Sequence, residues 1–246
     1  MAAALVILAL LGVWELVVRL GAVDPLLLPP PSDVAKALWT DRGDLGADLG
    51  VTVREVLVGL AVAVAAGVAI ALAMHLSPLA RRALRPLVIG SQAVPVPVIA
   101  PLVILVLGFG LAPKVLLVAL VCFFPVAINL FDGLRRVDPD ALKLMRSFDA
   151  SRWQTFRLLE APAALPATFT GLKVAAAVSV IGAVFAEWAG SESGLGHALL
   201  TANGQLDTPR AFAATALLFA LAVALYGAVG LLEKRLVTWT PRTGDA

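Results

Sequence analysis

The stretch VREVLVGLAVAVAAGVAIALAM, Val53 to Met74, has the length and apolar content needed to cross the hydrocarbon core of a bilayer. Its charged residues, Arg54 and Glu55, lie together at its beginning. Its glycines and alanines would allow close contact with neighbouring helices inside a membrane. Thr52, immediately before the stretch, is typical of a residue that caps a helix N-terminus. The stretch therefore predicts a membrane-spanning helix that begins after Thr52.

The rest of the chain repeats this pattern. Of its 246 residues, 60% are hydrophobic and 15% are charged, whereas ordinary soluble domains are about half apolar and about a quarter charged. The first apolar block lacks the basic segment that precedes the apolar part of a secretory signal, so we expect it to be retained. We expect an all-α membrane protein of about six transmembrane helices, formed by residues 3–20, 53–74, 87–107, 113–134, 166–188 and 211–236.

The third block is rich in proline. Pro95, Pro97 and Pro101 lie within it, and Gly108 and Gly110 follow it. Because proline removes a backbone donor, we expect a broken or kinked helix that lines protein or a water-filled path. The pattern fits a gate and a kinked packing helix equally well.

Basic residues concentrate in alternate links between the blocks. The links at 75–85 and 132–165 and the C-terminal end hold most of the arginines and lysines, whereas 21–50 and 189–210 hold few beside many acids. Cytoplasmic links carry the excess of basic residues. We therefore expect both termini, including a tail at 240–246, in the cytoplasm. The net charge of +2 follows this topology and does not indicate a nucleic-acid partner.

The link at 132–165 predicts two short helices. Asp138-Pro139 is typical of an N-cap followed by proline at the first helical position. Asp149 tolerates the left-handed conformation that ends a helix. The run Ser151 to Gln154 fits a capping box that starts a second helix, and Pro162 is expected to end it.

These two helices would be apolar on one side and basic on the other. Trp153, Phe156 and Leu159 recur every third residue and predict an apolar ridge. Such a knob could dock into a groove on a partner protein. The residues alone leave open a second interpretation, a pair of interfacial helices attracted to anionic lipid.

Other kinds of site have little support in the sequence. Cys122 is the single cysteine and lies in an apolar block, so we interpret it as a packing residue. His75 and His197 lack ligand clusters at metal-binding spacing, and we expect both to be ordinary loop residues. There is no Walker-type glycine loop, and the aspartates near 132–140 lack the clustered pattern of metal-dependent membrane enzymes.

A secondary transporter is the other functional class to weigh. It would usually need ionisable residues inside its spans to couple an ion gradient. Here the charged residues within the spans lie toward a span end. They are Glu15, Arg19, Arg54, Glu55, Lys173, Glu187 and Glu233. Glu15 and Arg19 are four residues apart and can pair with each other.

The stretch LKLMRSFDASRWQTFRLLEAPAALPATFTGLKVA, residues 142–175, resembles the coupling loop of binding-protein-dependent permeases. The family pattern is Glu-Ala-Ala, three residues, glycine, and a later Leu-Pro. Lys-Leu-Met at 143–145 replaces the triplet and Asp149 replaces the glycine, whereas Leu165-Pro166 matches the Leu-Pro. The resemblance implies that residues 138–162 contact an ATPase through Lys143, Met145, Arg146, Asp149, Ala150, Ser151, Arg152, Trp153, Phe156 and Pro162.

Similar stretches, including PLVILVLGFGLAP and SESGLGHALL, extend the resemblance in the same order over residues 53–239. It implies a type-I (MetI-like) ABC importer permease of the bacterial inner membrane, with a permease domain at 51–239 after an N-terminal helix and external segment at 1–50. The implied assembly is a homodimer around a central path, with two ATPase subunits and an external solute-binding protein. ATP would be used by the ATPase, and this chain would bind no cofactor.

The resemblance is strongest to the subfamily that moves nitrate, taurine, alkanesulfonates and thiamine pyrimidine precursors. The run KVAAAVSVIGAVFAEWAGSESGLG, residues 173–196, looks most like the pyrimidine-precursor branch. We interpret Glu187 as a solvated charge, with substrate contact as the alternative, and Trp188 as an interface anchor. The candidates for the translocation path are Gln92, Pro95, Pro97, Ser179 and Glu187.

Overall fold

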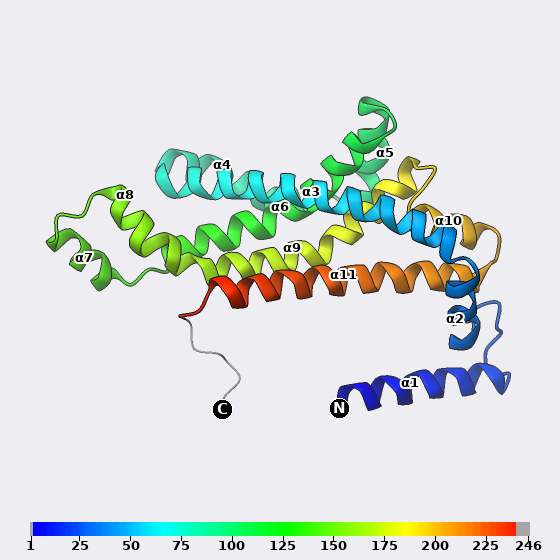
Figure 1. The fold of residues 1–246 in the computed structure, drawn as a ribbon. Coiled ribbons are helices and arrows are strands. Elements are labelled where there is room, and N and C mark those ends of the chain that lie inside the picture. The colour runs from blue at the N-terminus through cyan, green and yellow to red at the C-terminus, as the bar shows by residue number, and fades with distance from the viewer. Residues whose placement is uncertain (1, 240–246) are drawn as a thin grey trace.

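Four long helices form a bundle in the computed structural model, which describes residues 2–239 (Figure 1). Each is long and apolar enough to cross a membrane. For the third helix, the candidate span also includes the short helical segments directly before it and covers Arg152–Gly190. No β-strand occurs among the described residues, which confirms the expected all-α membrane fold. The four helices are α3 (Arg42–Leu76), α6 (Leu111–Arg135), α9 (Ala161–Gly190) and α11 (Thr208–Leu236).

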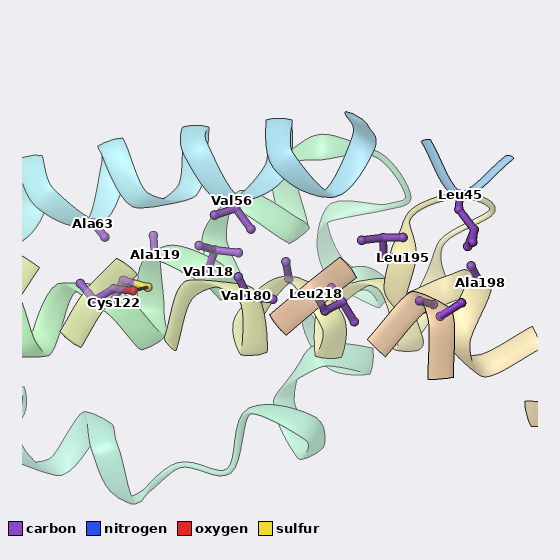
Figure 2. Close-up of a cluster of buried hydrophobic side chains, with 14 of the residues drawn as sticks. Leu45, Val56, Ala63, Val118, Ala119, Cys122, Val180, Leu195, Ala198 and Leu218 are labelled. Atoms are coloured by element: carbon purple, nitrogen blue, oxygen red, sulfur yellow. Dashed lines mark hydrogen bonds between the residues drawn. The ribbon is translucent and has the colours of Figure 1, made fainter. Parts of the chain in front are cut away.

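Helix α6 packs closely against both α3 and α9 because glycines lie at the contacts. A Cβ atom added to Gly59 of α3 would lie 2.5 Å from Val118 Cβ, and one added to Gly67 would lie 2.9 Å from Val126 Cβ. On α9, a Cβ at Gly182 would lie 3.1 Å from Val118 Cα. Small residues let helix backbones approach in this way. Figure 2 shows the buried side chains between the helices, including Val56, Ala63, Ala119, Cys122 and Val180.

The third expected span is broken, as its prolines predicted. It consists of α4 (Pro78–Gly90), the 3₁₀ turn η1 (Ser91–Ala93) and α5 (Val96–Leu107), and the pair is bent by 102°. The break falls at Pro95, which is extended with φ −69° and ψ 115°. With this pair counted as one span, the described residues contain five candidate spans.

The expected first span, residues 3–20, forms the apolar helix α1 (Ala2–Arg19), which is outside this count. It lies apart from the bundle in Figure 1 and reaches it through the Trp14 and Phe212 rings, whose centroids are 6.0 Å apart. Glu15 and Arg19 form the expected pair, with Arg19 Nε 2.9 Å from Glu15 Oε1.

The second expected span begins earlier than predicted. Helix α2 (Pro31–Thr40) is followed at once by α3, so Thr52 lies inside a helix and does not cap one. The prediction was wrong because polar residues 42–51 continue the helix beyond its apolar part. The Thr52 side chain is buried and serves a contact with another helix.

The two expected short helices are α7 (Pro139–Ser147) and α8 (Arg152–Thr155), at the end of the bundle opposite α10 (Leu195–Gly204) (Figure 1). The Asp138 side chain caps α7, and Ser151 and Gln154 form the complete capping box of α8. Asp149 has the expected left-handed conformation, with φ 51°. These local predictions are confirmed.

The prediction that Pro162 ends the second helix was wrong. The chain continues from α8 through a π-helical segment, η2 (Phe156–Glu160), directly into α9. Proline lacks a backbone donor, and a π-turn shifts the hydrogen-bond register just before it. Pro162 therefore lies in the first turn of α9, where its missing N–H costs little.

Candidate functional site

The coupling loop, residues 138–162, exposes large apolar side chains. Leu144 is 57% exposed, Phe148 73% and Trp153 65%. The Trp153 ring stacks on Phe156 with centroids 5.8 Å apart and an interplanar angle of 24°. Apolar groups gathered in this way on one projection mark an interaction surface.

The structure brings the predicted loop residues together but gives them different surroundings. Lys143, Arg146, Asp149, Ser151 and Arg152 are exposed, whereas Met145, Ala150, Phe156 and Pro162 are half-buried. Phe148 was missed by the sequence reasoning. Its spacing of three residues from Met145 could have placed it beside the predicted apolar face of the first helix.

The loop is tied to the end of α3. His75 Nε2 lies 2.9 Å from Glu160 Oε2, and the His75 ring is 6.4 Å from the Phe156 ring. Phe156 also packs against a buried cluster that includes Met74 and Leu134. His75 was expected to be an ordinary loop residue, but it lies in the last turn of α3 and anchors the coupling loop.

A polar cluster lies buried at the α10 end of the bundle. Its centre is Glu187, which is 1% exposed. The Thr52 hydroxyl donates a hydrogen bond of 2.7 Å to Glu187 Oε1, and the backbone N–H of Gly196 donates one of 2.5 Å to Oε2. Leu195 N–H donates in turn to Thr52 Oγ1 at 2.9 Å. Our interpretation of Glu187 as a solvated charge was therefore wrong, because the segment after α9 folds back over it.

The cluster extends to α6 through a buried ion pair. Lys114 Nζ lies 2.5 Å from Glu55 Oε1 and 2.6 Å from Ser191 Oγ, and both charged side chains are less than one-tenth exposed. Lys114 falls at the start of the expected span 113–134, and the sequence reasoning did not identify this pair. Since breaking a buried pair leaves an uncompensated charge, the cluster holds α3, α6, α9 and the following loop in one arrangement.

Gly194 makes this arrangement possible. Its φ of 109° is a conformation that other residues rarely adopt, and a Cβ atom there would collide with the Glu187 carboxylate. Its backbone N–H donates a hydrogen bond of 2.7 Å to Asp48 Oδ1 on α3. The turn at 191–194 is therefore held against α3 through Asp48 and against α9 through Glu187.

The path candidates lie in different surroundings. Gln92, Pro95 and Pro97 are exposed at the bend between α4 and α5. Ser179 is buried and donates to the Ala176 carbonyl of its own helix at 2.7 Å, which is a packing contact. Trp188 is 42% exposed, and its Nε1 donates to the Gly196 carbonyl at 2.9 Å.

The described residues thus form the apolar helical bundle of a membrane protein, with a broken span and two exposed short helices at one end. Residues 63–238 match the family described as "Binding-protein-dependent transport system inner membrane component". The chain belongs to this family, which confirms the resemblance, and it is a multi-pass inner-membrane protein of the ABC permease class.

Three relatives align over nearly the whole chain. A probable ABC transporter permease of Haemophilus influenzae is 35% identical, with 95% of both chains covered. The formylaminopyrimidine transport permease ThiX of Halalkalibacterium halodurans is 32% identical, covering 94% of this chain and 93% of that protein. The riboflavin transport system permease RibX of Chloroflexus aurantiacus is 35% identical, covering 95% and 88%.

The fold also matches a solved structure. A crystal structure of an amino acid ABC transporter with histidines superposes with a TM-score of 0.64 at 16% identity, covering 80% of this chain and 96% of that one. At this identity the match speaks for the fold alone, and it confirms the type-I ABC permease bundle.

Proposed function

We propose that this chain is the membrane-spanning subunit of an ATP-driven importer and that the coupling loop is where a separate ATPase docks. The exposed apolar projection formed by Phe148 and Trp153 carries this proposal. Phe148 directly follows α7 and Trp153 lies in α8, and these two short helices lie at one end of the bundle (Figure 1). An aromatic side chain that fills a groove on a partner can contribute ~2 kcal/mol or more to binding. In this proposal ATP is bound and used by the ATPase, and this chain binds no cofactor.

The orientation in the membrane follows from the same proposal. The link at 132–165 and the α4 link together carry eight of the fourteen arginines, so they face the cytoplasm together with both termini. The polar cluster and α10 then lie at the external side, where a solute-binding protein would deliver its cargo. In this orientation the ATPase contacts the cytoplasmic end of the bundle, and the solute-binding protein contacts the external end.

The translocation path would form between two copies of the chain. The α4–α5 bend exposes Gln92, Pro95 and Pro97 together with apolar residues such as Val98 and Leu102. Irregular backbone at membrane depth is tolerated where it lines protein or a water-filled cavity. The bend is therefore our first candidate for the path. The exposed apolar surface of the other spans would contact membrane lipid. Ser179 and Glu187 could reach the path only if the helices around them moved apart.

The solute is a small polar molecule, and we propose a thiamine pyrimidine precursor. Support comes from the similarity to the formylaminopyrimidine permease. Taurine, alkanesulfonates and nitrate are the alternatives within the same machinery. Titration of the solute-binding protein encoded with this chain against each compound would distinguish among them.

Reconstitution tests the proposal as a whole. The chain would be purified with its ATPase, placed in liposomes, and supplied with the loaded solute-binding protein. We expect uptake that requires ATP and the ATPase. Uptake that proceeds without the ATPase and follows an ion gradient would overturn the proposal and favour a secondary transporter.

A further inference from the structure

A cavity of about 550 Å³ lies between the end of α3 and the coupling loop. Leu76, Leu142 and Phe156 form its apolar wall. Arg146 from α7 and Arg152 from α8 also line it. The cavity is thus built from both short helices of the loop and from a membrane-spanning helix.

The charges around this cavity are unbalanced. Glu160 is the one acidic side chain among the lining residues, and it is already bound to His75. Within residues 2–239, neither Arg146 nor Arg152 is paired with a carboxylate. A guanidinium group offers several donors in a planar fork that matches a carboxylate, and it is weakly hydrated compared with an ammonium group. The cavity therefore presents two free cations beside an apolar wall.

We infer that this cavity receives a carboxylate-bearing segment of the ATPase subunit, with Arg146 and Arg152 binding the carboxylate. The inference rests on the proposed docking role of the coupling loop. The apolar wall would pack the body of the segment, while Phe148 and Trp153, which are exposed on the same loop, would contact the surface around it. Charge complementarity and the apolar surroundings thus favour one kind of occupant.

Lys143 is not part of this arrangement. It does not line the cavity, and its Nζ lies 2.8 Å from Asp140 Oδ1 in a pair that is largely exposed. An exposed pair of this kind contributes little. Lys143, which replaces the glutamate of the family pattern, is therefore a poor candidate for determining binding specificity. In our inference Arg146 and Arg152 determine it.

The test measures the affinity between the full chain in nanodiscs and its purified ATPase, at low and at high NaCl concentration. The double variant Arg146→Glu, Arg152→Glu should lose about tenfold or more in affinity, and the double glutamine variant should lose less. The glutamine variant should also show a weaker salt dependence than the wild type, because the screened attraction has been removed. The double variant Arg82→Glu, Arg85→Glu on α4 makes the same charge change at exposed positions outside the cavity and should bind normally.

Three outcomes would overturn the inference. If the double glutamate variant binds the ATPase like the wild type while Trp153→Ala does not, the docking proposal stands and the cavity assignment falls. If Arg146→Gln, Arg152→Gln leaves docking intact but abolishes retention of phosphatidylglycerol by the purified chain, the cavity holds an anionic lipid headgroup. If neither Trp153→Ala nor the arginine variants affect the ATPase, the proposed docking function itself fails.

Discussion

The Thr52 hydroxyl of α3 donates a hydrogen bond of 2.7 Å to the Glu187 carboxylate of α9. At the other end of the bundle, His75 at the end of α3 lies 2.9 Å from Glu160, just before α9. The two polar contacts join the same two segments at both ends, with α6 packed against each of them. These contacts therefore fix α3 against α9, and the segment just before it, at both ends of the bundle.

Replacement of Glu187 tests the cluster. Glu187→Ala leaves the backbone N–H groups of Gly196 and His197 without their acceptor, and each unsatisfied buried group costs ~1–3 kcal/mol. The Thr52 hydroxyl can still donate to the Asp48 carbonyl, at 3.2 Å. We expect a clear fall in the thermal unfolding midpoint in detergent. Glu187→Gln keeps one acceptor and should fall less. A midpoint equal to that of the wild type for Glu187→Ala would contradict a structural role.

The same variant bears on transport. If Glu187 contacts the solute, Glu187→Ala should reduce uptake even under conditions where the protein stays folded. Uptake unchanged at low temperature would remove Glu187 from the path candidates and leave it as a structural residue. The measurement is initial uptake in liposomes, normalised to folded protein.

The glycine contacts of α6 give a second prediction. A Cβ at Gly59 would lie 2.5 Å from Val118 Cβ, so Gly59→Ala forces the helices apart and should cost ~1–3 kcal/mol. Gly50, in the same helix, has nothing within 4 Å of an added Cβ. Gly50→Ala should be neutral or stabilise the helix by ~0.5–1 kcal/mol. Equal unfolding midpoints for the two variants would contradict the packing argument.

The sequence predicted features that depend on neighbouring residues. The cap at Asp138, the capping box at Ser151 and the left-handed Asp149 follow from local backbone chemistry, and all three are present. Asp149, which stands where the family pattern has glycine, has this left-handed conformation. The break at Pro95 also follows locally, because proline and the residue before it both resist helical geometry.

Contacts between distant segments could not be predicted in this way. Thr52 and Glu187 are separated by 135 residues, and nothing in the sequence around either indicates the other. Thr52 therefore resembled a helix cap, and Glu187 resembled a solvated charge at a span end. The Lys114–Glu55 pair was missed for the same reason, since the two residues lie on different helices and are far apart in the sequence.

Membrane topology can be tested by labelling introduced cysteines in intact cells. The native Cys122 is fully buried in the bundle and should not react. Asp44→Cys and Arg82→Cys lie on opposite sides in the proposed orientation, so a reagent that cannot cross the membrane should label only the first. Labelling of both positions from the same side would contradict the orientation derived from the arginine distribution.

The final prediction concerns the coupling loop. Trp153 is 65% exposed, so Trp153→Ala should abolish co-purification of the ATPase while the chain stays folded and inserted in the membrane. Phe148→Ala should weaken it, since that ring is also exposed. Phe156→Ala should abolish it too, because Phe156 supports Trp153 and fixes the loop against His75.

The charge at position 143 provides the contrast. Lys143→Glu changes an exposed pair worth ~0–1 kcal/mol, so docking should survive it if the apolar ridge governs the contact. A loss of docking in this variant would instead indicate an acidic counterpart on the ATPase that faces Lys143. Retention of a fully coupled ATPase by both Trp153→Ala and Phe156→Ala would refute the docking assignment. The loop would then act as a pair of interfacial helices, and its exposed aromatic rings would face lipid headgroups.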